Sequence, residues 1–340
     1  MDYSVLSRRR TELMGAAMLW VMLFHASGLE FGIPLLNLVR KAGFGGVDMF
    51  ILLSAMGLAM SLSRREQDYS AFMARRGARI LPAYYLVMIP YTLTLILTQG
   101  RPWAALLWNS TLLYYWMRSS GAFNWYVAGA MTFYAVTPFC FRRLRDARRR
   151  ELAAGTAILA SLALCQVLTH EGYWYVMDFF YRVPLFFLGL LMGFYVLEGR
   201  RLGGKDLLFW AGALCAGAVY ASVSLTAQWI SWPIHFPECH LFLFTTVPMC
   251  LVLGLCLEKL PLGWLRRFLA LVGSNSLEIY LLNVSFLYFP EPPALLLARV
   301  PVRPLCYLIL FAVNIALGCL LHAAVERLRR ALSRPPVQAV

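Results

Sequence analysis

The chain has 340 residues, of which 60% are hydrophobic and only 14% are charged, and its mean hydropathy is +0.64. Soluble domains carry about 25% charged residues, so this composition excludes a soluble globular protein and predicts a polytopic membrane protein. The net charge of +14 does not indicate a nucleic-acid partner, because the arginines cluster beside the ends of apolar segments. The eight cysteines have no metal-ligand spacing and predict no metal site.

Ten segments are long and apolar enough to cross about 30 Å of hydrocarbon. They lie at residues 13–29, 45–63, 80–99, 124–141, 152–169, 182–197, 207–226, 240–257, 268–289 and 304–325. An eleventh candidate, 103–117, is shorter and contains Asn109, Ser110 and Thr111.

Basic residues decide whether that short segment crosses, because cytoplasmic loops are enriched in Lys and Arg. If it does not cross and the N-terminus is cytoplasmic, all but seven of the 31 basic residues face the cytoplasm. The exceptions are Arg40, Lys41, Arg101, Arg118, Arg182, Arg299 and Arg303. We therefore predict an all-α polytopic membrane protein with about ten transmembrane helices, both termini cytoplasmic and one short re-entrant or interfacial segment. Residues 1–332 form a single transmembrane domain in this prediction, and 333–340 a disordered tail.

The first two spans each contain an ionisable residue, His25 and Asp48. Such a residue costs roughly 2.5–3.5 kcal/mol in the hydrocarbon region on insertion scales, and it usually faces the bundle interior or a wet cavity. The predicted topology places both residues in the outer half of the membrane, where an antiparallel helix pair would bring them together. The alternative is that His25 hydrogen-bonds a neighbouring helix and Asp48 only starts its own helix.

Three arginines, Arg75, Arg76 and Arg79, lie within about one helical turn at the predicted cytoplasmic mouth. They can share a helix face and hold an anionic cytoplasmic ligand. Simple membrane topology and phospholipid contact explain them as well.

Other polar residues interrupt later apolar spans. Glu278, Tyr280 and Asn283 lie in the ninth predicted span, where Glu278 is either a pore or substrate contact or a neutral, hydrogen-bonded acid. Trp125 and Tyr126 open the fourth span, where they form either a platform for a sugar ring or part of an interfacial aromatic belt.

Five short motifs follow one another between residues 13 and 283. They are Val21-Met22-Leu23-Phe24-His25; Gly46-Val47-Asp48-Met49-Phe50 with Leu53-Ser54; Phe72-x-x-Arg75-Arg76-x-x-Arg79-Ile80-x-Pro82-x-Tyr84-Tyr85; Trp125-Tyr126 with Phe133-Tyr134 and Pro138; and Gly273-x-x-Ser276-Leu277-Glu278-Ile279-Tyr280-Leu281-Leu282. In this order and spacing they resemble the membrane acyltransferase-3 family of bacterial O-acyltransferases.

The resemblance implies a multi-pass protein of the bacterial cytoplasmic (inner) membrane that transfers an acyl group, commonly acetyl. The donor is a cytoplasmic acyl-CoA co-substrate, with no bound cofactor, and the acceptor is a hydroxyl of a cell-surface glycan or a lipid-linked molecule. We expect His25 to act as general base or as transient acyl carrier, and Asp48 to orient its imidazole or to stabilise the imidazolium. The donor-binding residues are then Arg75, Arg76 and Arg79, and those of the acceptor or pore are Trp125, Tyr126, Glu278, Tyr280 and Asn283.

The chain also departs from the family pattern. Met14 stands where the family has an arginine eleven residues before the histidine, and Ala130 stands where it has a glutamate. Ser54-Ala55 replaces a serine-glycine pair, and Asn283 stands where the late motif often ends in histidine. These departures leave a second hypothesis, a non-enzymatic or transporter/flippase-like relative with the same fold.

Overall fold

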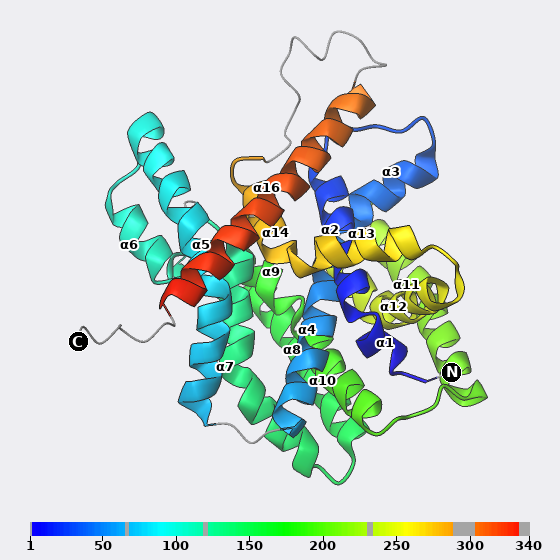
Figure 1. Cartoon of the computed structure of the whole chain (residues 1–340). Coiled ribbons are helices and arrows are strands. Elements are labelled where there is room, and N and C mark those ends of the chain that lie inside the picture. Colours follow the sequence, from blue (N-terminus) through cyan, green and yellow to red (C-terminus); the bar gives the residue numbers. More distant parts are fainter. Residues whose placement is uncertain (1, 65–67, 118–121, 230–233, 288–302, 333–340) are drawn as a thin grey trace.

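The computed structural model describes residues 2–64, 68–117, 122–229, 234–287 and 303–332, and every secondary-structure element in these ranges is a helix (Figure 1). The α-helices are α1 (Val5–Arg8), α2 (Arg10–His25), α3 (Pro34–Lys41), α4 (Gly45–Arg64), α5 (Tyr69–Gln99), α6 (Ala104–Ser110), α7 (Trp125–Asp146), α8 (Arg150–His170), α9 (Met177–Phe180), α10 (Val183–Leu197), α11 (Gly204–Trp229), α12 (Leu241–Lys259), α13 (Gly263–Ser274), α14 (Ser276–Val284) and α16 (Arg303–Leu332). Short 3-10 helices are η1 (Ala42–Phe44), η2 (Tyr114–Met117), η3 (Trp174–Val176) and η4 (Glu238–His240). The tail predicted at 333–340, Arg118 and Arg299 lie outside the described residues.

Seven helical segments of the described residues are long and apolar enough to cross a membrane, which confirms an all-α membrane protein. They are Pro34–Arg64, Tyr69–Gln99, Arg150–His170, Trp174–Leu197, Gly204–Ala227, Glu238–Lys259 and Pro304–Ala331. Each contains one of the ten predicted spans, wholly or nearly so. The spans predicted at 13–29 and 124–141 correspond to α2 and α7, and the span predicted at 268–289 has a different structure.

The ninth predicted span is not one continuous helix. It is divided between α13 and α14, which meet at Asn275, and α13 packs across α2 in Figure 1. The Nδ2 atom of Asn275 donates to the carbonyl oxygen of Leu271 at 2.7 Å. Just before this break, a Cβ on Gly273 would lie 1.9 Å from the carbonyl oxygen of Thr11 in α2. The change of direction therefore follows from a backbone contact between helices far apart in sequence.

Helix α4 lies at the centre of the packed bundle, between α2 and α10. A Cβ on Gly46 would lie 2.5 Å from the carbonyl oxygen of Ala17 in α2. On the other side, a Cβ on Gly189 of α10 would lie 2.4 Å from the carbonyl oxygen of Leu52. These small residues let the three helix backbones approach closely, as is common in membrane bundles where lipid gives little hydrophobic drive for association.

Residues 103–117 contain only the seven-residue α6 and the short η2. At 1.5 Å per residue α6 is about 10 Å long, too short to cross a bilayer. The hydroxyl of Tyr84 in α5 donates to the carbonyl oxygen of Asn109 at 2.8 Å, and that of Tyr85 donates to Ser110 at 2.9 Å. These bonds hold the segment against α5.

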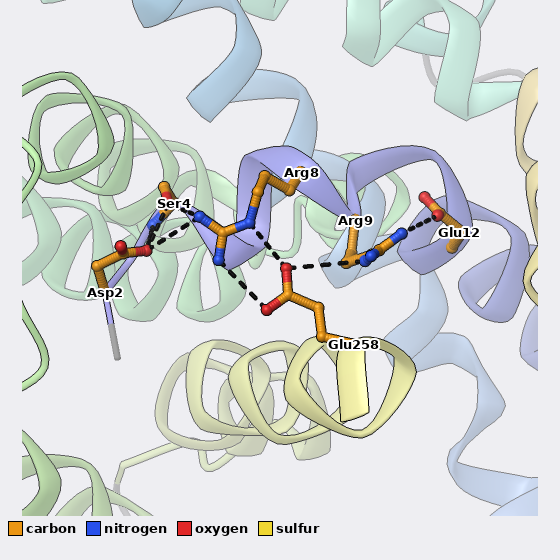
Figure 2. A network of polar contacts seen from close by, with 6 residues as sticks. All are labelled: Asp2, Ser4, Arg8, Arg9, Glu12 and Glu258. Carbon is orange, nitrogen blue, oxygen red and sulfur yellow. Dashed lines mark hydrogen bonds and ion pairs between the residues drawn. The ribbon is translucent and has the colours of Figure 1, made fainter. Parts of the chain in front are cut away.

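A polar network joins the N-terminal segment to the end of α12 (Figure 2). Arg8 pairs with Glu258 at 2.8 Å and with Asp2 at 3.3 Å. Arg9 lies 3.8 Å from the same Glu258 carboxylate and pairs with Glu12 at 3.1 Å. Two of the three consecutive arginines at the start of the chain therefore have carboxylate partners.

Further ion pairs join two other segments at the same end of the bundle. Arg150 pairs with Glu198, and Arg200 pairs with Glu151 at 3.6 Å, so the start of α8 contacts the loop after α10. The backbone N–H of Tyr3 donates to the carbonyl oxygen of Arg200 at 3.1 Å, which adds the N-terminal segment. We call this end, defined by Arg8, Arg150 and Arg200, the basic end.

Candidate active site

A cavity of about 270 Å³ lies between α2, α4, α5, α7 and α14, and it includes the first residue of α2 at the basic end. Its lining residues are Arg10, Met14, Val21, Val47, Phe50, Ser54, Gly57, Leu58, Ser61, Arg76, Arg79, Ile80, Tyr126, Tyr134, Ser276, Leu277 and Tyr280. The charged side chains among them are three arginines, and no Asp or Glu in the described part of the chain lines the space. We call it the arginine cavity.

The three arginines have no acidic partner in the part of the chain that the structure describes. No carboxylate of the described residues forms an ion pair with Arg10, Arg76 or Arg79. The guanidinium of Arg76 lies 5.8 Å from the ring centroid of Tyr134, and its Nη2 atom is 3.5 Å from Ser61 Oγ. A cavity with three unneutralised cations attracts an anionic ligand.

The predicted trio Arg75, Arg76 and Arg79 is divided by the cavity. Arg76 and Arg79 line it, whereas Arg75 is exposed and is not among the lining residues. The cavity faces the side of α5 that carries Arg76, Arg79 and Ile80. Arg75 lies about 100° around the helix from Arg76, because an α-helix has 3.6 residues per turn.

A second cavity, of about 370 Å³, contains His25, the last residue of α2. It is lined by Val21, Phe24, His25, Lys41, Phe44, Val47, Trp125, Asp178, Arg182, Glu238, Cys239 and Tyr280. We call it the histidine cavity. Because α2 has sixteen residues, its length of about 24 Å separates Arg10 in the first cavity from His25 in the second.

The imidazole of His25 is held by Asn283 of α14, whose Oδ1 atom contacts His25 Nδ1. An amide oxygen only accepts hydrogen bonds, so this contact places the ring proton on Nδ1. The lone pair of the neutral imidazole is then on Nε2, as a general base requires. The sequence had assigned Asn283 to the acceptor or pore, and the structure places it directly on the histidine.

Asp48 faces Arg182 rather than His25. Asp48 is fully buried, its Oδ2 atom lies 3.9 Å from Arg182 Nε, and neither carboxylate oxygen has a hydrogen-bond partner among the described residues. Arg182 also donates to the carbonyl oxygen of Asp178 at 2.6 Å and lies 4.8 Å from the ring of Trp125. The imidazole therefore does not donate a hydrogen bond to Asp48, and Asp48 does not orient it as expected. The proximity of Arg182 explains the difference, because a buried carboxylate requires a positive partner.

The two cavities adjoin one another at Val21, Val47 and Tyr280, which line both. The ring of Tyr280 packs edge-on against Tyr126 with centroids 5.1 Å apart. Tyr126 lines the arginine cavity, and Trp125 lines the histidine cavity. The side chain of Tyr280 thus stands between a cationic space and a space that contains a candidate base.

Glu278 lines neither cavity. It is only 4% exposed, and its Oε1 atom lies 2.9 Å from Nδ1 of His322 in α16. Helix α14 therefore contacts two histidines, His25 through Asn283 and His322 through Glu278. The second contact fits the hydrogen-bonded acid that the sequence left as one alternative.

Sequence reasoning missed two arginines of these cavities, Arg10 and Arg182. Arg10 belongs to a run of three arginines that we attributed to membrane orientation, yet it lies four residues before Met14 and hence on the same helix face. Arg182 counted as one of the few basic residues on the outer side. The position of each residue in the sequence was the available signal. Arg10 lies one helical turn before Met14, and Arg182 is the first residue of the apolar span predicted at 182–197.

A family model described as an acyltransferase domain matches residues 15–323 of the chain. Comparison of the chain with curated proteins and with solved structures gives no match. The matched residues include both cavities except Arg10 and Met14.

Proposed function

The chain belongs to the acyltransferase-3 family of membrane acyltransferases, and we propose that it moves an acyl group from acyl-CoA to a hydroxyl of an envelope glycan or related acceptor. The observation that carries this proposal is the junction of two cavities at Tyr280. One cavity presents three arginines with no acidic partner among the described residues, and the other contains His25 with its Nδ1 atom against Asn283. This arrangement suits a phosphate-bearing donor and a hydroxyl acceptor that approach from opposite ends of the protein.

The proposed topology has ten spans, the ninth of them divided between α13 and α14, with both termini in the cytoplasm. The grouping of basic loops supports it: ion pairs join the N-terminal segment, the start of α8, the loop after α10 and the end of α12. Segments that share one end of the bundle share one side of the membrane, and arginine-rich ends favour the cytoplasm. The arginine cavity then opens toward cytoplasmic acyl-CoA, and the histidine cavity lies toward the outer side.

Arg76 and Arg79 bind phosphate groups of CoA in this proposal. Guanidinium groups present paired N–H donors that match phosphate oxygens, and hydrogen bonds between ions are about twice as strong as neutral ones. The acyl-pantetheine arm extends past Tyr280 toward His25. Acetyl is the acyl group that the family resemblance favours.

His25 acts as general base in the transfer step. Its Nε2 atom accepts the proton of the acceptor hydroxyl as that oxygen attacks the thioester carbonyl. The tetrahedral intermediate then expels the CoA sulfur, which takes the proton from the imidazolium, so that the products are the ester and CoA. Arg182, in the same cavity, provides positive charge for the oxyanion, and Trp125 offers a face for a sugar ring.

The test is transfer of radiolabel from acetyl-CoA into the glycan and lipid fractions of membranes that contain the protein. We expect label with the wild-type protein and a loss of about 100-fold or more with His25→Ala, since general bases contribute about 10²–10⁴-fold. Unchanged labelling by folded His25→Ala would exclude the general-base role.

The same assay tests the transporter or flippase alternative. A transporter with this fold would leave the total amount of acetyl-CoA thioester unchanged, whereas acyl transfer consumes it in proportion to the ester formed. No consumption by folded wild-type protein with acceptor present would favour the alternative.

A further inference from the structure

The side chain of Arg10, the first residue of α2, reaches across to α4 inside the arginine cavity. We propose that Arg10 binds a phosphate of the acyl donor together with Arg76 and Arg79, and that Gly57 is the residue that makes room for it. This inference rests on the proposed acyl-CoA donor. Arg10 precedes residues 15–323, so the family match assigns it no role.

The guanidinium of Arg10 has a defined position. Its Nε atom donates to the carbonyl oxygen of Leu53 in α4 at 3.0 Å. This bond uses one of the five N–H donors of the guanidinium, and the remaining donors belong to the two terminal nitrogens. Those two nitrogens form a planar pair that can bind a phosphate at two points.

Gly57 lies directly against this guanidinium. A Cβ on Gly57 would lie 2.8 Å from Cζ of Arg10 and 2.9 Å from its Nη2 atom. Carbon atoms in contact are normally about 3.5–4.0 Å apart, so any larger residue would push the guanidinium out of its place. The obstacle is the end of a flexible side chain, so the backbone of α4 need not move.

The two arginines that precede Arg10 in the sequence differ from it, because both have carboxylate partners. Arg8 and Arg9 contact Glu258, and Arg9 also pairs with Glu12 (Figure 2). Arg10 has no carboxylate partner among the described residues and instead joins Arg76 and Arg79 as a lining residue of the arginine cavity. Of three consecutive arginines, two stabilise the fold and the third enters the cavity.

Three guanidinium groups from two helices define the chemistry of the ligand. Like charges around one cavity repel each other, and a polyanion relieves that repulsion. Phosphate fits better than a single carboxylate, because it offers more acceptor oxygens and up to two negative charges. We therefore expect Arg10 to recognise the phosphates of CoA and not its neutral pantetheine part.

Binding of CoA and of pantetheine, measured by calorimetry on protein in phosphatidylcholine nanodiscs, tests this proposal without catalysis. Arg10→Ala should weaken CoA binding by at least about 10-fold, as expected for a hydrogen bond to a charged group, and leave pantetheine binding unchanged. Arg10→Lys should restore part of the loss, because it keeps the charge but not the paired donors. Arg64→Ala is the control, since Arg64 is an exposed arginine at the end of α4 outside the cavity.

A double-mutant cycle tests the role of Gly57. Gly57→Ala should weaken CoA binding in the wild-type background, although Arg10 is still present. In the Arg10→Ala background the same change should alter the affinity by less than about 2-fold, because the group that it displaces is gone. Equal effects of Gly57→Ala in both backgrounds would show that Gly57 acts without Arg10.

The possible failures are distinguishable. If the folded wild-type protein binds no CoA, the proposed donor is wrong and this inference fails with it. If the wild-type protein and Arg10→Ala bind CoA equally, only the role of Arg10 is overturned. If Arg10→Ala keeps its affinity for CoA but loses phosphatidylglycerol that co-purifies with the wild-type protein, Arg10 binds a lipid phosphate, and its assignment to the donor site is overturned while acyl-CoA remains the proposed donor.

Discussion

The Nδ1 atom of His25 at the end of α2 contacts the Oδ1 atom of Asn283 in α14, 258 residues later in the chain. This contact joins the proposed base to the helix that also carries Tyr280 between the two cavities. The partner of the imidazole is the uncharged amide of Asn283, so no buried carboxylate is needed to orient the ring. The catalytic geometry therefore depends on where α14 lies.

Asn283→Ala should lower kcat for acyl transfer by about 10- to 100-fold, since even a 1 Å misplacement of a catalytic group can cost about 100-fold. The KM for acetyl-CoA should stay the same, because Asn283 lines neither cavity. Steady-state kinetics in proteoliposomes measure both constants. Ser285→Ala is the control, since its hydroxyl donates to backbone carbonyl oxygens of α14 and to no other group of the described residues. An increase in donor KM alone would indicate that Asn283 contacts the donor.

The pair of Asp48 and Arg182 should matter most for stability. Their side chains are 0% and 4% exposed, so Arg182→Met leaves an uncompensated buried carboxylate and should cost about 3–5 kcal/mol. The double variant Asp48→Asn, Arg182→Met should recover a large part of this loss. Thermal unfolding in detergent measures both effects. If the double variant is less stable than Arg182→Met alone, Asp48 has a stabilising partner other than Arg182.

The sequence predicted those features of the fold that depend on local composition. Length and hydropathy located α4, α5 and α10, and charge in apolar runs correctly identified His25 and Asp48 as buried or cavity residues. The break between α13 and α14 was missed, because it depends on a backbone contact of Gly273 with a helix more than 250 residues away.

The sequence predicted where the site residues lie better than it predicted which side chains they contact. The predicted topology put Asp48 and His25 in the same half of the membrane, but only the packed structure shows that Arg182 pairs with the carboxylate and that Asn283 contacts the imidazole. Arg10 looked like a topology signal because its neighbours are arginines. Side-chain direction, which composition does not contain, decides between these roles.

The contact between α2 and α13 should tolerate no added methyl group. Gly273→Ala places a Cβ 1.9 Å from a backbone oxygen of Thr11, so the two helices must separate. We expect a loss of several kcal/mol, more than the roughly 1–3 kcal/mol typical of overpacking, since backbone has to move. Gly155→Ala is the matched control: Gly155 lies in α8 with nothing within 4 Å of its Cβ position, and alanine is the better helix former. Equal melting temperatures for the two variants would contradict the close approach.

The N-terminal network should make stability depend on pH through Asp2. The pKa of Asp2 is lowered from 3.8, chiefly because the Ser4 hydroxyl bonds to the carboxylate, with a smaller contribution from the Arg8 charge. A lower pKa in the folded state means that the carboxylate stabilises the fold above pH 3.8 and loses this effect as the pH falls through the folded-state pKa. The wild-type protein should therefore melt above Asp2→Asn at pH 7, by an amount worth less than about 1 kcal/mol for this exposed pair, and the difference should shrink as the pH falls below 3.8. Ser4→Ala should move this decrease to higher pH, and a difference that persists unchanged at pH 3 would exclude the ionised carboxylate as its cause.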